Sequence, residues 1–455
     1  MKVAFYTLGC KVNQYETQAV AQEVTRRGYL LVSEEEKADV YVVNTCSVTR
    51  EADRKSRQYM RRMKRLSPEA VVVMMGCYPQ VSPIETSQLP EADIIIGTED
   101  KVSVPDLVER FLNDRRRIDR FLDEGLEIGP SGCMPLQKEY QEIGSVTSML
   151  GSRRALIKIQ EGCNRFCSYC IIPHARGAIR SRSPQSIKKE ALGLLEQGCR
   201  EIVLAGINTA LYGAENGFKN DLGWPEDDLK NIRGIEIVVK LLNDLPGDFR
   251  IRLNSLEPTV VDSNYLTGLL KYEKLAHHAH LSAQSGSDSV IKAMNRHYTS
   301  ADYLDMVRIL KEFDPYYGIT TDIIAGFPSE TEEDFQQSLK LVEEAGFLHV
   351  HAFPYSVRPG TPAAQMQQVP PAVKKERAAR LAKAADEASL RFRESLIGTV
   401  QRVLPEEPDG ALWRGHSSNY ADVYFAAPEG KDMTSEFVDV IIKTIYKDGV
   451  FGEIC

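Results

Sequence analysis

The chain has 455 residues, of which 43% are hydrophobic and 26% charged, a balance typical of folded domains and not of disordered chains. At roughly 150 residues per domain, this length predicts about three domains. The 56 basic and 64 acidic side chains give a net charge of −8, which argues against coating nucleic acid but leaves room for a local basic site. The sequence shows no signal peptide and no membrane-length apolar run, so we expect a cytoplasmic protein with no membrane partner.

The first hundred residues alternate short apolar runs with helix-like stretches. This alternation predicts a parallel α/β sheet. The predicted strands are residues 3–7, 40–44, 71–75 and 94–96, and the predicted helices are residues 13–27 and a stretch ending near residue 66.

Nine cysteines, an odd number in an apparently cytoplasmic chain, favour metal or catalytic roles over a disulfide framework. Cys10, Cys46 and Cys77 each follow one of the first three predicted strands. Because the carboxyl ends of parallel strands share one edge of a sheet, we expect these thiols to converge. The alternative is three small buried apolar residues, the usual state of a free cysteine. Three repeats of one placement favour a shared site.

Residues 100–152 are less regular and predict a helix at 104–114 followed by a linker, in which Cys133 has no assigned role. Larger strand–helix units then resume and predict a complete or partial TIM-like β/α barrel. Its strands are expected at residues 156–160, 201–205, 250–253, 279–281, 318–324 and 349–353, and its helices include 186–197, 288–295, 300–313 and 331–345. A helix at 374–393 and β-prone runs at 400–404, 422–425 and 437–445 predict a small C-terminal β-barrel.

The sharpest motif is Cys163-x3-Cys167-x2-Cys170, in a loop just after the first predicted barrel strand. Structural zinc normally takes four ligands, often in two separated pairs, whereas closely spaced thiolates hold [4Fe–4S] clusters. Three ligands leave one iron open, and the amino and carboxylate groups of S-adenosylmethionine can bind there. The motif therefore predicts radical chemistry, in which the protein orients the cofactor and excludes side reactions.

At this triad the chain resembles the radical S-adenosylmethionine superfamily, and nearly its whole length is similar to the methylthiotransferase family. The matching segments are residues 7–17, 44–46, 76–77, 159–163, 176–177, 180–182, 284–287, 294–298, 321–331, 355–361, 413–415 and 419–420. The resemblance implies three domains: a methylthiotransferase domain (residues 1–120), a radical domain (149–380) and a C-terminal TRAM barrel (383–451).

The resemblance also implies two [4Fe–4S] clusters and S-adenosylmethionine. Cys163, Cys167 and Cys170 would hold the radical-generating cluster. The other thiols, Cys10, Cys46 and Cys77, would hold a second cluster, where the sulfur to be transferred binds. One S-adenosylmethionine would methylate that sulfur and another would give the radical that removes hydrogen from carbon. Both clusters should then face one cavity.

Members of this family modify adenosine 37 of tRNA or an aspartate of a small-subunit ribosomal protein. Residues 9–17 look most like the group acting on carbon 2 of N6-threonylcarbamoyladenosine. Isopentenyladenosine and the ribosomal aspartate remain alternatives, and a non-catalytic iron–sulfur electron carrier or scaffold is the alternative from another class. The expected partners are the tRNA anticodon loop, a low-potential electron donor and a sulfur source.

Weaker signals mark residues near predicted strand ends and beside the triad as contacts to S-adenosylmethionine or substrate. These are Tyr169, Gly206, Asn208, Ser255, Glu257 and Gln284. The basic segments 50–65, 150–182 and 374–393 are candidates to track phosphates, with solvated helix faces as the alternative. We favour function for the middle segment, because it surrounds the triad.

The C-terminal barrel is acidic, so RNA contact there would use stacking on Trp413, Tyr420 or Tyr424, or a patch beside Arg402 or Arg414. The alternatives are core aromatics and a barrel that mainly packs on its neighbour. Of the remaining cysteines, Cys199 is expected to pack on a helix end and Cys455 to be a free tail thiol. The last expectation concerns His277, His278 and His280, which are predicted at the surface or a strand end with no metal-ligand spacing.

Overall fold

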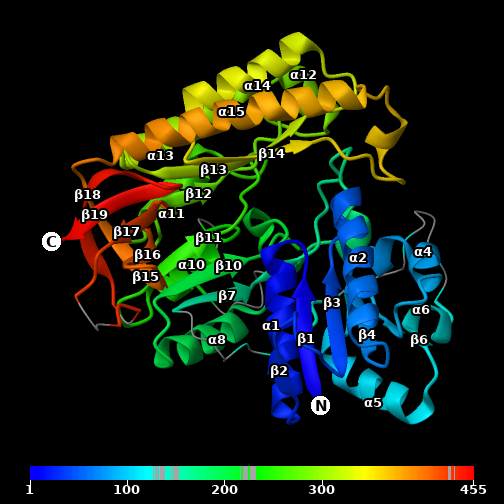
Figure 1. Cartoon of the computed structure of the whole chain (residues 1–455). Coiled ribbons are helices and arrows are strands. Elements are labelled where there is room, and N and C mark those ends of the chain that lie inside the picture. Colours follow the sequence, from blue (N-terminus) through cyan, green and yellow to red (C-terminus); the bar gives the residue numbers. More distant parts are fainter. Residues whose placement is uncertain are drawn as a thin grey trace. The chain divides into compact units, whose positions relative to one another are not determined.

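The structure is a computed structural model of the chain, and it describes residues 1–126, 128, 133, 139–144, 146, 153–215, 217–218, 224–225, 232–428, 432–434 and 436–455. Most of the predicted linker after residue 126 lies outside these residues. The chain divides into two compact units (Figure 1). Unit 1 comprises residues 1–148, 160–182 and 356–365, and unit 2 comprises residues 149–159, 183–355 and 366–455. Among the helices in the described residues, none is both long and apolar enough to cross a membrane.

Unit 1 is built on a six-stranded parallel sheet in the order β2-β1-β3-β4-β5-β6 (Figure 1, blue to cyan). Its central strands β3 and β4 are buried along their whole length, because helices cover both faces of the sheet. The strands are β1 (Lys2–Thr7), β2 (Leu30–Val32), β3 (Val40–Thr45), β4 (Val71–Gly76), β5 (Ile94–Ile95) and β6 (Ile118–Asp119). The helices are α1 (Lys11–Arg26), α2 (Arg50–Leu66), α3 (Cys77–Val81), α4 (Pro83–Ser87), η1 (Lys101–Ser103), α5 (Val104–Asp114) and α6 (Arg120–Asp123).

Short elements of two later segments, residues 160–182 and 356–365, also belong to unit 1. They are β8 (Gln160–Glu161), α7 (Ile172–Arg176), β9 (Arg180–Ser181) and η4 (Pro362–Gln365). Strands β8 and β9 pair antiparallel. The segment with the cysteine triad is therefore part of unit 1.

Unit 2 carries six parallel strands in chain order. Two three-stranded sheets, β11-β10-β7 and β12-β13-β14, are linked by isolated bridges such as Leu256 to Leu281. The strands are β7 (Arg154–Lys158), β10 (Glu201–Ala205), β11 (Arg250–Leu253), β12 (His278–His280), β13 (Gly318–Ala325) and β14 (His349–Pro354). Sequential parallel order with helical crossovers confirms the predicted TIM-like architecture, here with six strands in the described residues.

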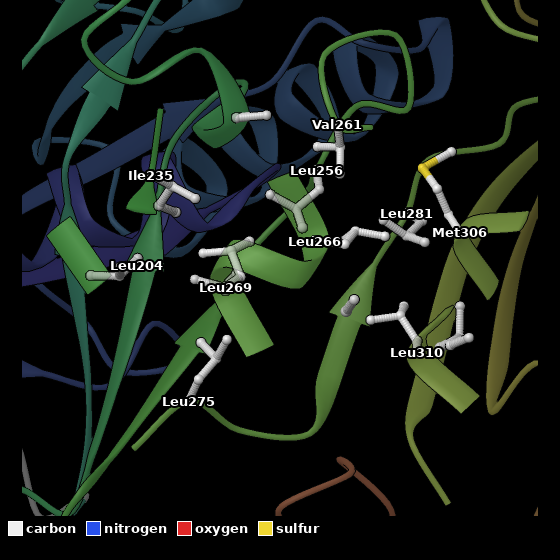
Figure 2. Close-up of a cluster of buried hydrophobic side chains, with 14 of the residues drawn as sticks. Leu204, Ile235, Leu256, Val261, Leu266, Leu269, Leu275, Leu281, Met306 and Leu310 are labelled. Carbon is white, nitrogen blue, oxygen red and sulfur yellow. The ribbon is translucent and has the colours of Figure 1, made fainter. Parts of the chain in front are cut away.

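The helices of unit 2 cover one face of these strands. They are α8 (Pro184–Glu196), η2 (Thr209–Leu211), α10 (Glu236–Asn243), α11 (Ser263–Leu270), α12 (Asp288–Ala293), α13 (Ser300–Phe313), α14 (Glu332–Ala345) and α15 (Pro371–Ser395). Figure 2 shows Leu204 of β10 in one apolar cluster with Leu266 and Leu269 of α11 and Leu310 of α13. This core holds the strand ends rigidly, and rigid strand ends can position a site.

The C-terminal part of unit 2 is a closed five-stranded barrel in the order β15-β16-β17-β19-β18. Its strands are β15 (Val400–Asp409), β16 (Leu412–Ser417), β17 (Asp422–Phe425), β18 (Val438–Tyr446) and β19 (Gly449–Ile454). The sequence predicted three of these strands. It missed β16 and β19, whose glycines and polar residues break the apolar alternation.

Buried charges join this barrel to the amino ends of the neighbouring parallel strands. Glu201 is 0% exposed and pairs with Arg154, Arg250 and Arg252. Burial alone would raise the pKa of the Glu201 carboxyl, but the three guanidiniums outweigh it and hold that pKa well below its usual range. Arg250 donates to the carbonyl oxygen of His416 at 2.7 Å, so one ion cluster fixes both parts.

The aromatic and basic residues proposed for RNA contact in the barrel are largely occupied within the protein. Tyr420 lies under the guanidiniums of Arg154 and Arg252. Tyr424 is buried. Arg402 pairs with Asp248, and Arg414 pairs with Asp422 and Glu407. These contacts favour the alternative of a barrel that mainly packs on its neighbour.

Candidate active site

Three cysteines meet at one edge of the unit 1 sheet. Cys10 follows β1 and precedes α1, Cys46 follows β3, and Cys77 begins α3 directly after β4. These strands are adjacent and parallel, in a register that places Thr7 opposite Asn44 and Thr45 opposite Gly76. The sheet therefore brings together the ends of the three strands that precede these cysteines, as the sequence predicts.

Glycines let the backbone carry these cysteines close together. Gly9 has φ +106°, and a β-carbon there would lie 2.9 Å from Cβ and 3.1 Å from Sγ of Cys46. Gly76 has φ +108°, and a β-carbon would lie 2.5 Å from the carbonyl oxygen of Thr45. Any other residue at either position would be strained and would push two cysteine loops apart.

The thiols of this site share an electrostatic environment. Burial, together with the neighbouring thiols of Cys77 and Cys10, raises the pKa of Cys46 to about 12. Burial also raises the pKa of Cys77, while the charges of Arg176 and Lys101 and a hydrogen bond from Arg176 lower it. Metal ligation needs thiolates, and buried cations beside Cys77 favour that form.

The second cysteine site is the loop between β8 and α7. The amide of Cys163 donates to the carbonyl oxygen of Gly177 at 2.9 Å, and that of Cys170 donates to Cys167 at 2.9 Å. Cys167 is buried, whereas Cys163 and Cys170 are half-buried. The loop is closed on itself and presents three thiols within eight residues.

Gly162 fixes the entry to this loop. It has φ +73°, and a β-carbon there would lie 1.8 Å from the carbonyl oxygen of Ala178. Gln160 donates from its amide to the carbonyl oxygen of Gly162 at 2.7 Å. The backbone between β8 and the first cysteine therefore has one conformation that only glycine permits.

Arg176 connects the two cysteine sites. It is 0% exposed and donates to Glu161 beside the triad at 2.6 Å and to Glu16 of α1 at 2.5 Å. It also donates to Asn13 Oδ1 at 2.5 Å and lies in hydrogen-bond contact with Cys77. One guanidinium thus reaches the triad segment, the helix that follows Cys10, and Cys77 itself.

Further buried charged and amide side chains form contacts around Arg176 and the loops that carry Cys10, Cys46 and Cys77. Lys101 is fully buried, pairs with Glu16 and lies 3.4 Å from Asn44 Oδ1. Asn13 donates to the carbonyl oxygens of Leu8 at 2.7 Å and Thr45 at 3.0 Å. The roles of Arg176, Glu16 and Lys101 were missed from sequence, where the only signal was their presence inside or near matching motifs.

The prediction that the basic segment around the triad tracks phosphates is wrong for three of its six arginines. Arg176, Arg180 and Arg182 are all buried. Arg180 pairs with Glu99, and Arg182 pairs with Glu142. Apart from Glu161, the carboxylates that neutralise them come from other parts of unit 1, which the local charge count did not include.

Among the weaker candidates, the structure joins residues that follow β10 to residues that follow β11 in unit 2. Asn208 after β10 donates to Glu257 after β11 at 2.7 Å, and both are buried. Thr209 donates to the carbonyl oxygen of Ser255 at 2.9 Å. Gly206 is buried at the end of β10.

The other two candidates belong to other segments of the chain. Gln284 is buried with φ +64° and forms a backbone bridge with Ile323 of β13. Tyr169 is half-buried in the triad loop of unit 1.

The remaining cysteines do not belong to either group of three. Cys199 is buried at the end of α8, as predicted, with its thiol 3.2 Å from the carbonyl oxygen of Glu201. Cys133 is buried near the carbonyl oxygen of Val81, and Cys455 is exposed at the tail.

Comparison with known proteins gives matches over most of the chain. Residues 2–97 match the uncharacterized protein family UPF0004, and residues 157–342 match the Radical SAM superfamily. The chain is 38% identical to the threonylcarbamoyladenosine tRNA methylthiotransferase MtaB of Bacillus subtilis, over 99% of this chain and 96% of that protein. It is 36% identical to the Aquifex aeolicus protein of the same name, over 97% and 100%.

Two further matches are a curated relative named for a different nucleoside and a solved structure. The tRNA-2-methylthio-N(6)-dimethylallyladenosine synthase of Pelotomaculum thermopropionicum is 34% identical, over 89% of this chain and 86% of that protein. Among solved structures, the radical S-adenosylmethionine methyltransferase TsrM from Kitasatospora setae aligns with a TM-score of 0.55 over 80% of this chain and 77% of that chain. At 14% identity this likeness supports the fold alone.

The fold, the triad and these matches define a radical S-adenosylmethionine enzyme. Within that superfamily, the chain belongs to the methylthiotransferase family of its full-length relatives. Membership implies S-adenosylmethionine and a [4Fe–4S] cluster. The triad loop fits that cluster, since it offers three thiols in one closed loop beside a buried ion network.

Proposed function

We propose that this chain is a methylthiotransferase that replaces the hydrogen on carbon 2 of N6-threonylcarbamoyladenosine at position 37 of tRNA. The observation that carries the proposal is the pair of three-cysteine sites in one compact unit, bridged by Arg176. A transfer that needs both a radical and a sulfur atom requires two such sites near each other. The chain's membership of the methylthiotransferase family supports the reaction type.

In this proposal, Cys163, Cys167 and Cys170 hold the radical-generating cluster, and Cys10, Cys46 and Cys77 hold a second [4Fe–4S] cluster. Together with S-adenosylmethionine, these groups supply a carbon-centred radical, a methyl group and a bound sulfur. Ordinary acid–base side chains cannot remove hydrogen from an unactivated aromatic carbon at a useful rate, so the reaction needs a carbon-centred radical.

The protein's own residues position these groups. Gly162 and the β8–β9 pair fix the triad loop, and Arg176 holds it against α1 while donating to Cys77. We further propose that Tyr169, Gly206, Ser255, Gln284 and the bonded pair of Asn208 and Glu257 contact S-adenosylmethionine or substrate. Buried, mutually bonded polar side chains at strand ends are suited to orienting a polar cofactor.

Two lines support threonylcarbamoyladenosine as the modified nucleoside. Residues 9–17 resemble that group, and relatives named for this substrate match at up to 38% identity. Relatives named for dimethylallyladenosine match at up to 34%. The difference is modest, so the isopentenyl-type substrate is the second candidate and the ribosomal aspartate the third.

A basic hollow on α2 supports tRNA as the partner. It is lined by Lys55, Arg61, Arg62, Lys64 and Arg65, together with Tyr6 and Tyr59, whose rings stack at 3.7 Å. Carboxylates offset part of this charge, since Arg61 pairs with Glu91 and Lys64 pairs with Asp93. We propose that this surface contacts phosphates.

We also propose three domains, at residues 1–120, 149–380 and 383–451. We further propose a low-potential electron donor and a sulfur source as partners, and a cytoplasmic location. The donor must deliver one electron to the radical-generating cluster, and the sulfur consumed at each turnover must be replaced.

The test is mass spectrometry of tRNA nucleosides from cells lacking this gene, with and without the restored protein. We expect methylthiolated threonylcarbamoyladenosine to vanish without the gene and to return with the intact protein but not with Cys163→Ala. Loss of the methylthio group from isopentenyladenosine instead would retain the reaction and overturn the substrate. No change in any tRNA nucleoside would overturn the tRNA assignment and direct attention to ribosomal protein.

A further inference from the structure

Three side chains of adjacent strands in unit 2 form a cluster outside both cysteine sites. His280 ends β12, Asp322 lies in β13 and His351 lies in β14. One ligand atom from each lies within 4.8 Å of the others. The residues are 42 and 29 positions apart in sequence, so no motif spacing predicted the cluster. The sequence shows no metal-ligand spacing around His277, His278 and His280, because the two neighbours of His280 in this cluster lie on other strands.

The sheet register explains the convergence. His280 is paired with Thr320, and Asp322 is paired with His351. Because side chains alternate between faces, positions 320 and 322 share one face of β13 and bring their partners to it. Ile319 and Ile323 lie on the other face, in the apolar core. The cluster therefore occupies the face turned away from the core.

The distances suit a shared ion. His280 Nε2 lies 3.2 Å from Asp322 Oδ2. Two ligands each about 2.1 Å from one ion are this far apart when they subtend an angle of about 100°, within the range for tetrahedral or octahedral coordination. The ring centroids of His280 and His351 are 6.0 Å apart. Imidazole nitrogens and one carboxylate are a donor set that first-row transition ions prefer.

Neighbouring groups orient the proposed ligands. Thr320 Oγ1 lies 3.0 Å from His280 Nδ1, which leaves Nε2 of that ring directed at Asp322. His349 Nε2 lies 3.2 Å from His351 Nδ1. Such outer contacts are how proteins fix the ring orientation of a metal-binding histidine. The Asp322 side chain is 30% exposed, so an ion there would remain open to a further ligand.

We propose that His280, Asp322 and His351 bind one divalent transition-metal ion, separate from the iron–sulfur clusters. Three protein ligands leave at least one coordination position for an oxygen ligand from solvent or substrate. The site stands on its own geometry and does not depend on which nucleoside the enzyme modifies.

The test is zinc binding by the cluster-loaded protein, measured by equilibrium dialysis and elemental analysis. We expect one saturable zinc per chain in the parent protein. Removing an outer-shell partner costs about 10–100-fold in metal affinity, so Asp322→Asn and His351→Ala should each cost at least about tenfold. The matched control is His297→Ala, an exposed histidine of the same unit, which should leave zinc binding unchanged.

Zinc K-edge X-ray absorption on the same samples identifies the ligands. We expect a shell of nitrogen and oxygen atoms. A sulfur shell would assign the zinc to cysteines and overturn the proposal. So would the absence of saturable zinc, or zinc binding that Asp322→Asn and His351→Ala leave intact.

Discussion

Cys163→Ala is expected to abolish reductive cleavage of S-adenosylmethionine and formation of the methylthiolated product. The substitution removes one of the three thiols that we propose to hold the radical-generating cluster, and the other two thiols of the triad loop already have that role in the proposal. The measurement is 5′-deoxyadenosine released under anaerobic conditions with a strong reductant, quantified by chromatography. We expect a fall to the background seen without protein.

The control is Cys455→Ala, which removes an exposed tail thiol outside both sites and should leave the yield unchanged. Release of 5′-deoxyadenosine by Cys163→Ala at the parent rate would contradict the assignment of the triad. Loss of activity in the Cys455 variant would show that the assay reports general damage.

Arg176→Ala is expected to destabilise unit 1 severely and to disturb both cysteine sites. The change leaves the buried carboxylates of Glu16 and Glu161 without their shared cation. Removing one partner of a buried ion pair costs about 3–5 kcal/mol, because the remaining charge is uncompensated. Burial alone would lower the pKa of Arg176, but the charges of Glu16, Cys77 and Glu161 raise it well above its usual range, so the guanidinium stays charged.

Thermal unfolding of the cluster-free protein measures this cost directly, and Arg176→Lys separates charge from geometry. Lysine keeps the charge but cannot form two parallel hydrogen bonds, so we expect an intermediate unfolding temperature. Arg308→Ala, in an exposed pair with Asp305 and Glu312, is the matched control and should cost about 1 kcal/mol or less. An Arg176→Ala protein as stable as this control would contradict the bridging role.

The chain order of strands and helices was largely predictable, because apolar runs of strand length alternate with helical stretches. The strands β3, β4, β10 and β11 fall within one residue of their expected limits. Of these, β3, β4 and β10 are fully buried, so their sequences are nearly continuous apolar runs. Periodicity also placed Cys10, Cys46 and Cys77 at strand ends, from which their convergence followed.

Long-range electrostatics could not be predicted in the same way. Arg176 has its partners 15 and 160 positions away, so its burial depends on the folded unit and not on local charge. Likewise, the register between β13 and β14 brings Asp322 to His351, and no local pattern encodes that register. Charged residues near a functional motif were therefore easy to mistake for a surface that meets solvent or RNA.

The central claim is that one compact unit holds two separate iron–sulfur clusters. The most direct measurement is the iron and sulfide content of the anaerobically reconstituted protein, compared with two triple variants. One variant replaces Cys10, Cys46 and Cys77 with alanine, and the other replaces Cys163, Cys167 and Cys170. The account predicts two [4Fe–4S] clusters per chain in the parent and one in each variant. A single cluster in the parent, or a parent content that survives in the N-terminal variant, would contradict it.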